Sequence, residues 1–119
     1  MAPRDPRGPL VASEVLIELE RFEEALASAE DAIALGPDLP DGYRQRAAAL
    51  VALGRSAEAE ADLRRALEIA PERVDSLEDL ARLLVAGRRT GEARDVLERL
   101  LALEPEHEAA AEMLSGLPD

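Results

Sequence analysis

The 119-residue sequence contains no cysteine and no tryptophan, and Phe22 and Tyr43 are its only aromatic side chains besides one histidine. Without cysteine the chain can form no disulfide framework, has no thiol nucleophile and lacks the thiolate ligands of many zinc sites. No apolar run approaches the roughly 20 residues that a membrane-spanning helix needs, and the start MAPRDPRGPLVAS lacks the apolar core of a secretory signal. We therefore expect neither thiol chemistry nor membrane insertion, and we expect a cytoplasmic protein.

Positive charge is also scarce, because 14 basic residues, all arginine, face 26 acidic residues and leave a net charge of -12. Such a charge repels phosphate backbones and anionic lipid surfaces, so we expect neither nucleic acid nor a membrane as the partner. Alanine and leucine, which are strong helix formers, supply most of the 47% apolar content. No stretch alternates apolar and polar residues for long enough to predict a strand. The composition predicts one all-α domain.

Three prolines, Pro37, Pro71 and Pro105, stand 34 residues apart, and each closes a similar phrase: AIALGP, ALEIAP and LLALEP. Aligning the chain on them gives three units without a gap, residues 6–39, 40–73 and 74–107, followed by part of a fourth. At four positions of the unit, the residue is apolar in all three units. These sets are Leu16, Leu50 and Leu84; Ala25, Ala59 and Ala93; Ile33, Leu67 and Leu101; and Leu35, Ile69 and Leu103. The pattern indicates duplication of one structural unit.

Each unit contains two helical patterns separated by a short break. In the second unit, Gly54 suits the left-handed end of the first helix. We expect Ser56 and Thr90 to cap the second helices of their units by accepting a backbone N–H. In the third unit Gly87 comes one residue earlier than the register predicts and Gly91 is an extra glycine, so we expect a looser turn there.

Small residues recur where two helices must approach each other closely. They align in the first helices at Ser13, Ala47, Ala81 and Ser115, and in the second helices at Ala25, Ala59 and Ala93. Their lack of bulk permits a short distance between helix axes. Arg46 stands where the next unit has Leu80, so we expect its charged group to pair with an acid or to extend into solvent.

The 34-residue spacing, these small residues, the late Ala32 and Ala66 and the closing prolines together resemble the tetratricopeptide repeat (TPR). The resemblance implies an all-α, right-handed α-solenoid of three helix-turn-helix repeats plus a short C-terminal helix, about residues 107–115. We expect residues 1–8 to be a flexible N-terminal segment and residues 9–119 to form a single TPR domain. The resemblance further implies a non-enzymatic module that binds a peptide segment of a partner protein in its concave groove.

The resemblance places this groove on the first helix of each repeat. Steps of three and four residues put the side chains of each helix on one face. The partner-binding residues that it implies are Glu14, Glu18, Asp41, Arg44, Gln45, Ala48, Asp75, Glu78, Asp79 and Arg82, with Ala52 and Ala86 on the same face. Acids outnumber arginines among them, which favours a basic or mixed-charge segment as the ligand.

One class of TPR domain does not fit this sequence. Repeat domains that clamp the C-terminal carboxylates of chaperones resemble each other in carrying lysine, arginine and asparagine on this face. The matching positions here are Leu10, Glu14, Gln45, Asp75 and Asp79. These side chains would repel or ignore a carboxylate, so we do not expect a chaperone cofactor of that type.

The sequence shows no catalytic machinery, and we expect neither a cofactor nor a metal site. His107, the only histidine, is interpreted as a solvated turn residue that helps to open the last helix. The arginine pairs at 64–65 and 88–89 lie among acids and are interpreted as a solvated helix face. Two alternatives stay open: a self-associating protein, in which a homodimer forms through solenoid ends with Met113 and Leu114, or an accessory repeat domain cut from a larger enzyme or regulator.

Overall fold

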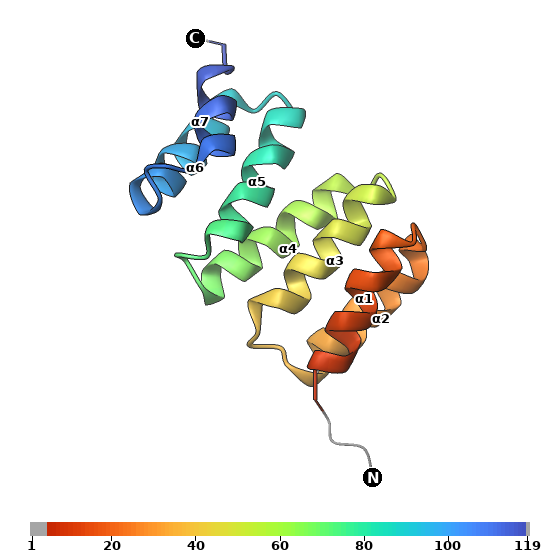
Figure 1. Ribbon diagram of the computed structural model, residues 1–119. Helices are drawn as coiled ribbons and strands as arrows, with labels where there is room; N and C mark the ends of the chain where they lie inside the picture. Colours follow the sequence, from red (N-terminus) through yellow and green to blue (C-terminus); the bar gives the residue numbers. More distant parts are fainter. Residues whose placement is uncertain (1–4, 119) are drawn as a thin grey trace. The chain divides into compact units, whose positions relative to one another are not determined.

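The computed structural model describes residues 5–118, which form seven α-helices and no strand (Figure 1). The helices are α1 (Arg7–Glu18), α2 (Phe22–Leu35), α3 (Pro40–Ala52), α4 (Ser56–Ile69), α5 (Val74–Ala86), α6 (Thr90–Leu103) and α7 (Glu108–Ser115). The predicted repeats correspond to the pairs α1–α2, α3–α4 and α5–α6. Of the expected flexible segment, residues 1–4 lie outside the described residues, and α1 already begins at Arg7.

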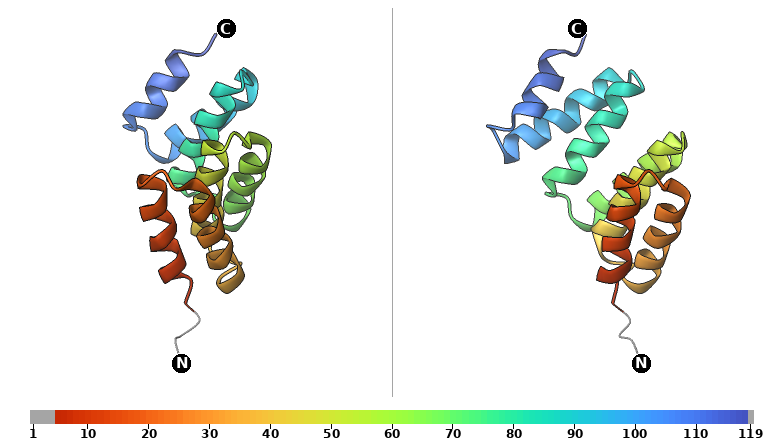
Figure 2. Two further views of the ribbon diagram at one scale, coloured as in Figure 1. Left: turned by 90° about the vertical axis from the view of Figure 1, so that its right-hand side faces the viewer. Right: turned by 45° about the vertical axis from the view of Figure 1, so that its right-hand side comes forward.

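The chain divides into two compact units, residues 1–70 with α1 to α4 and residues 71–119 with α5 to α7. In the first unit α1 packs against α2, both pack against α3, and α3 packs against α4. In the second unit α5 packs against α6, and α7 contacts both of these helices. Figure 2 shows the helices of each unit from two further sides. Each unit is therefore built from neighbouring antiparallel helices joined by short turns.

The same turn joins the two helices of each pair. Its central residue, Glu20, Gly54 or Arg88, has a φ of 60°, 78° or 59°. The next backbone N–H donates to a carbonyl five residues earlier, at 2.8, 2.8 and 2.9 Å, which is the Schellman arrangement. The prediction of a looser third turn is therefore wrong. Arg88 takes the left-handed conformation that Gly54 takes in the second pair, while Gly87 ends α5 with a φ of -84°.

The second helix of each pair is preceded by an arginine at its N-cap position, Arg21, Arg55 or Arg89, and none has a side-chain cap. The predicted caps at Ser56 and Thr90 are wrong, because both residues already occupy the first helical position. An N-cap side chain must lie one residue earlier to reach the free N–H groups of the first turn.

Each of these arginines forms an ion pair with a glutamate three residues later. The Nη2–Oε2 distances are 2.7 Å for Arg21–Glu24, 2.8 Å for Arg55–Glu58 and 2.8 Å for Arg89–Glu92. Each guanidinium also donates from Nε to the same carboxylate. Such two-bond pairs fix both side chains, and each glutamate lies in the first turn, where the helix dipole favours negative charge.

The small residues of the three helix pairs are buried, whereas Ser115, at the end of α7, is exposed. Exposure is at most 2% at Ala25, Ala47, Ala59, Ala81 and Ala93. Ser13 is fully buried as well, and its Oγ donates a hydrogen bond of 3.2 Å to the carbonyl of Ala25 on α2. Larger side chains at these positions would push the paired helices apart.

Candidate partner-binding face

In the first unit, the predicted site residues lie on α1 and α3, which are in contact. The exposed ones are Glu14, Glu18, Ala48 and Ala52, and the half-buried ones are Asp41, Arg44 and Gln45. Asp41 and Arg44 are each engaged by another group. The structure thus brings the first two predicted sets onto two neighbouring helices of one unit.

In the second unit, the predicted residues Asp75, Glu78, Asp79 and Arg82 follow one another along α5. Glu78 is paired on both carboxylate oxygens: Oε2 lies 2.5 Å from Nη2 of Arg82, and Oε1 lies 2.9 Å from Nε2 of His107. Much of the charge of Glu78 is therefore balanced within the unit. It has a structural role that the sequence pattern did not indicate.

Asp75 has a similar double role at the start of α5. Its Oδ2 lies 2.9 Å from Nη2 of Arg73, and its Oδ1 accepts the backbone N–H of Ser76 at 2.7 Å. Asp79 is half-buried and is engaged by another group. Asp75 and Glu78 therefore already stabilise local structure around α5.

His107 occupies the N-cap position of α7. Its Nδ1 accepts the backbone N–H of Ala110 at 3.1 Å, and its side chain is only 15% exposed. Because Nδ1 accepts a hydrogen bond, a neutral ring carries its proton on Nε2 and donates it to Glu78. The interpretation of His107 as a solvated residue is wrong, although it does open the last helix. It connects α7 to α5.

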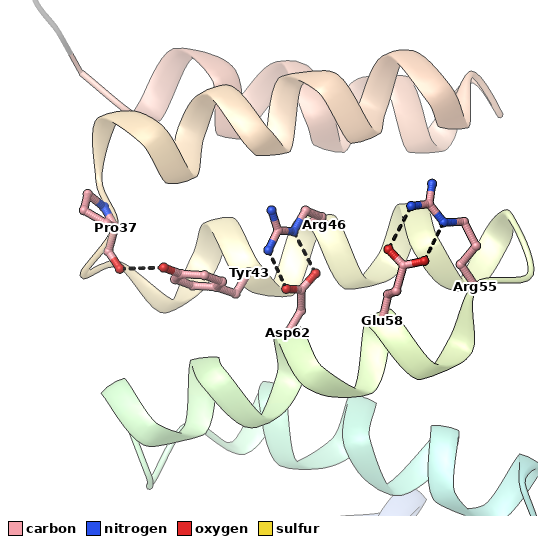
Figure 3. A network of polar contacts seen from close by, with 6 residues as sticks. All are labelled: Pro37, Tyr43, Arg46, Arg55, Glu58 and Asp62. Carbon is pink, nitrogen blue, oxygen red and sulfur yellow. Dashed lines mark hydrogen bonds and ion pairs between the residues drawn. The ribbon is translucent and has the colours of Figure 1, made fainter.

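A second polar cluster lies in the first unit between α3 and α4 (Figure 3). Nε and Nη2 of Arg46 donate to Oδ2 and Oδ1 of Asp62 at 2.9 and 2.8 Å, and the Asp62 side chain is 7% exposed. The hydrogen bond with Asp62 raises the pKa of Arg46 above its ordinary value. Of the two expected outcomes for Arg46, pairing with an acid or extension into solvent, the structure shows the pairing. Sequence reasoning did not identify the acid.

Tyr43 lies next to this pair and has two kinds of contact. Its hydroxyl donates to the carbonyl of Pro37 at 2.9 Å, which ties α3 to the preceding connection (Figure 3). The guanidinium carbons of Arg46 and Arg65 each lie 5.9 Å from the centre of the ring, within the range of cation–π attraction. Tyr43, and then Glu68, raise the pKa of Arg65. The cluster is structural.

A pocket of about 310 Å³ lies beside this cluster within the first unit. It is lined by Leu26, Glu30, Arg46, Leu50, Arg55, Glu58, Ala61 and Asp62. Its two arginines form ion pairs with two of its three carboxylates, Asp62 and Glu58, and the hydrogen bond from Arg55 lowers the pKa of Glu58. Charged groups that neutralise one another in this way do not form an acid–base or nucleophilic constellation.

Within residues 5–118, no three His, Cys, Asp or Glu side chains are grouped so that they could hold a metal ion. In the same part of the chain, no helix has the length and apolar content needed to cross a bilayer.

Two family models match the sequence, and both are described as tetratricopeptide repeat. One matches residues 13–78, which is more than half of the chain, and the other matches residues 50–117. This chain belongs to the tetratricopeptide repeat family. A comparison with curated proteins found no sequence match. The TPR resemblance inferred from the spacing of the prolines is thus confirmed.

Solved TPR domains share the fold at low sequence identity. The first TPR of Spaghetti (RPAP3) bound to the HSP90 peptide SRMEEVD has a TM-score of 0.91 and 20% identity, over 98% of this chain and 93% of that one. The first TPR domain of human RPAP3 gives 0.90 and 22%, over 98% and 91%. The TPR2B domain of yeast Sti1 in its pHsp70 complex gives 0.87 and 21%, over 92% and 93%. The all-α helical-repeat fold is confirmed.

Proposed function

We propose that this TPR chain is a non-enzymatic interaction module of the cytoplasm that binds a peptide segment of a partner protein on its first helices. Family membership supports this proposal. So does the fold, because solved TPR domains of the same fold include one bound to an HSP90 peptide and one in a pHsp70 complex. Among residues 5–118, the polar clusters described above contain no catalytic constellation that would support an enzyme instead.

The ligand we propose is a basic or mixed-charge segment. The observation that carries this step is the excess of acids among the predicted partner-binding residues, where Glu14, Glu18, Asp41, Asp75, Glu78 and Asp79 accompany only Arg44 and Arg82. The other arginines of the first helices, Arg7 and Arg46, are paired with Asp5 and Asp62. A surface of one charge sign raises the rate at which an oppositely charged segment associates, and salt screens this effect. On α3, the exposed Ala48 and Ala52 leave room for side chains of the ligand.

The ligand we propose differs from the chaperone peptide of the structural neighbour. SRMEEVD is acidic, whereas the positions that would have to hold its carboxylates are Leu10, Glu14, Gln45, Asp75 and Asp79. None of these side chains is a cation, and three are acids that lie on the first helices. An acidic C-terminus would meet repulsion here. Arg44 and Arg82 instead act as orienting donors to backbone carbonyls or to an acid within a mixed-charge ligand.

The test is a selection of random linear peptides, displayed on phage, against the immobilised chain at low salt. We expect the enriched peptides to carry net positive charge and to lose roughly tenfold or more in affinity for the variant Glu14→Lys/Glu18→Lys/Asp79→Lys. We avoid Asp75 and Glu78 because lysine at either would also break the contacts with Arg73 or His107. Asp79 is engaged by another group as well, so circular dichroism must show that the lysine variant keeps its helix content.

The matched control is Glu23→Lys/Asp31→Lys/Glu98→Lys, which makes the same change in net charge at exposed positions of the second helices α2 and α6. The proposal requires the peptides to discriminate between the two variants. Enrichment of acidic peptides, or an equal loss of affinity on both variants, would refute it.

Self-association is less favoured by the charge. Met113 and Leu114, the residues considered for an end-to-end contact, are half-buried within α7. Two copies that each carry a charge of -12 also repel one another at low salt. Light scattering should therefore give the mass of a monomer.

A further inference from the structure

The most exposed large apolar side chains of the described residues lie on one face of α1. Val11, Val15 and Leu19 are 58%, 47% and 58% exposed. They are spaced four residues apart, so they form one stripe along the helix and its C-cap. A contiguous stripe of this kind, unlike a single exposed leucine, indicates a surface that another molecule covers.

The equivalent face of α3 is covered by helices. Ala49, which corresponds to Val15, is 0% exposed, and Leu53, which corresponds to Leu19, is half-buried. The cover comes from the preceding repeat, since α3 packs against both α1 and α2. The α1 stripe therefore corresponds to the face of α3 that packs against the preceding repeat.

Two glycines at equivalent positions show the same difference. A Cβ added to Gly42 of α3 would lie 2.9 Å from Cγ1 of Ile33 on α2, because the two helices are in close contact there. A Cβ added to Gly8 of α1 would meet nothing within 4 Å. Gly8 is thus uncovered, whereas Gly42 at the equivalent position lies against α2.

The stripe is apolar, whereas the outer faces of repeat arrays that stay exposed to solvent are polar. Here Val11 stands where α3 has Gln45 and α5 has Asp79, so the first repeat is more apolar at this position than the two that follow. The sequence keeps apolar groups on the face where solubility alone would favour polar ones.

The charge beside the stripe indicates what covers it. Glu14 and Glu18 lie three residues after Val11 and Val15 and are exposed along the same side of α1. The only basic residue of α1, Arg7, is already paired with Asp5. A second copy complements this surface poorly, because each copy carries a charge of -12 and α7, with the sequence EAAAEMLS, contains no basic residue.

We propose that α1 is the docking site for a basic amphipathic helix of a partner protein. The apolar face of that helix packs on Val11, Val15 and Leu19, and its lysine or arginine side chains pair with Glu14 and Glu18. This inference rests on the proposed function, because Glu14 and Glu18 belong to the first-helix face. It goes further by assigning a helix, with an apolar contact, to the part of the ligand that reaches α1.

The experiment selects a phage library of stably helical peptides, randomised on one face, against the full chain. We expect the enriched helices to carry apolar residues at i and i+4 with lysine or arginine beside them. A synthetic peptide of the best sequence should shift backbone amide signals of α1 in the 15N-labelled chain. It should bind the variant Val11→Ser/Leu19→Ser roughly tenfold or more weakly, because two apolar contacts are lost.

The control is Val51→Ser/Leu103→Ser, which makes the same two replacements at side chains that are 46% and 39% exposed on α3 and α6. It should leave the affinity within about twofold, since surface substitutions away from a contact have small effects. Circular dichroism confirms that both variants keep their helix content.

Four results would overturn the inference: no enriched helix, enriched helices without basic residues, amide shifts confined to other helices, or equal binding to both serine variants. A concentration-dependent dimer that is lost only in Val11→Ser/Leu19→Ser would replace the partner helix by a second copy. If linear peptides still discriminate the lysine variants while no helix binds α1, the inference fails and the proposed function stands. If neither library enriches a binder, both fail.

Discussion

Arg46 and Asp62 are joined by two hydrogen bonds between α3 and α4, at the positions that hold Leu80 and Val96 in the next repeat. An ion pair thus stands where the next repeat has two apolar side chains. Such a pair is favourable only when complete, because removal of one partner leaves the other charge poorly solvated. Asp62 is the more sensitive member, since its side chain is 7% exposed and that of Arg46 is 29% exposed.

The first prediction concerns this pair. Arg46→Leu alone should lower the free energy of unfolding by about 2 to 4 kcal/mol, because Asp62 loses its cation. The double variant Arg46→Leu/Asp62→Val copies the next repeat and should recover most of this loss. Urea unfolding of the wild type, the single variants Arg46→Leu and Asp62→Val, and the double variant gives the coupling energy. Additive losses, with no recovery in the double variant, would show that the two side chains do not act as a pair.

The second prediction tests the helix crossing in the α3–α4 pair. Ala59→Leu should destabilise the chain by about 1 to 3 kcal/mol, because Ala59 is 0% exposed and the added atoms overpack the crossing. Ala61→Leu makes the same replacement at an exposed position of α4 and should change stability by less than about 0.5 kcal/mol. Thermal melting that does not distinguish the two variants would place the crossing elsewhere.

The third prediction concerns the left-handed turns. Glu20→Gly and Arg88→Gly should each stabilise the chain by about 0.5 to 1 kcal/mol, because both residues have a φ near 60° that glycine adopts without strain. Gly54→Ala, at a φ of 78°, should destabilise it by a similar amount. Gly91→Ala, inside α6 with nothing within 4 Å of the new Cβ, should be neutral or stabilising. Denaturant midpoints of the four variants check these signs.

The fourth prediction concerns the attachment of α7. His107→Ala removes both the cap on Ala110 and the hydrogen bond to Glu78, and should destabilise the chain by about 1 to 2 kcal/mol. His107→Asn keeps a capping group but is too short to reach Glu78, so it should recover only part of the loss. Hydrogen exchange in α7 measures the effect locally. Unchanged protection in His107→Ala would mean that α7 is held by its apolar contacts alone.

The sequence was sufficient for the fold because its signals are periodic. Pro37, Pro71 and Pro105 mark the unit, and the alanine and serine columns mark the crossings, so helix pairs follow from spacing alone. The turns were less predictable. Reasoning from glycine positions failed for Arg88, because the repeated packing imposes a left-handed residue there whatever its type.

The contacts of the polar clusters could not be predicted from the spacing of residues in the sequence. Asp62 lies 16 residues from Arg46 and on another helix. His107 lies at the N-cap of α7, whereas Glu78 lies on α5. Both contacts therefore depend on how the helices pack. One signal was available and was missed: the sequence Arg-x-x-Glu recurs at the start of every second helix, from Arg21, Arg55 and Arg89. Its 34-residue period indicates the N-cap ion pairs directly.

The association rate of a basic peptide is the most direct test of the central claim. Stopped-flow fluorescence would follow the peptide selected on the linear library at low and at physiological salt. We predict that added salt slows association, and that Glu14→Lys/Glu18→Lys/Asp79→Lys slows it roughly tenfold at low salt, whereas Glu23→Lys/Asp31→Lys/Glu98→Lys keeps most of the wild-type rate. Equal low-salt rates for wild type and the first-helix variant, with helicity intact, would contradict the assignment of the ligand to the first helices.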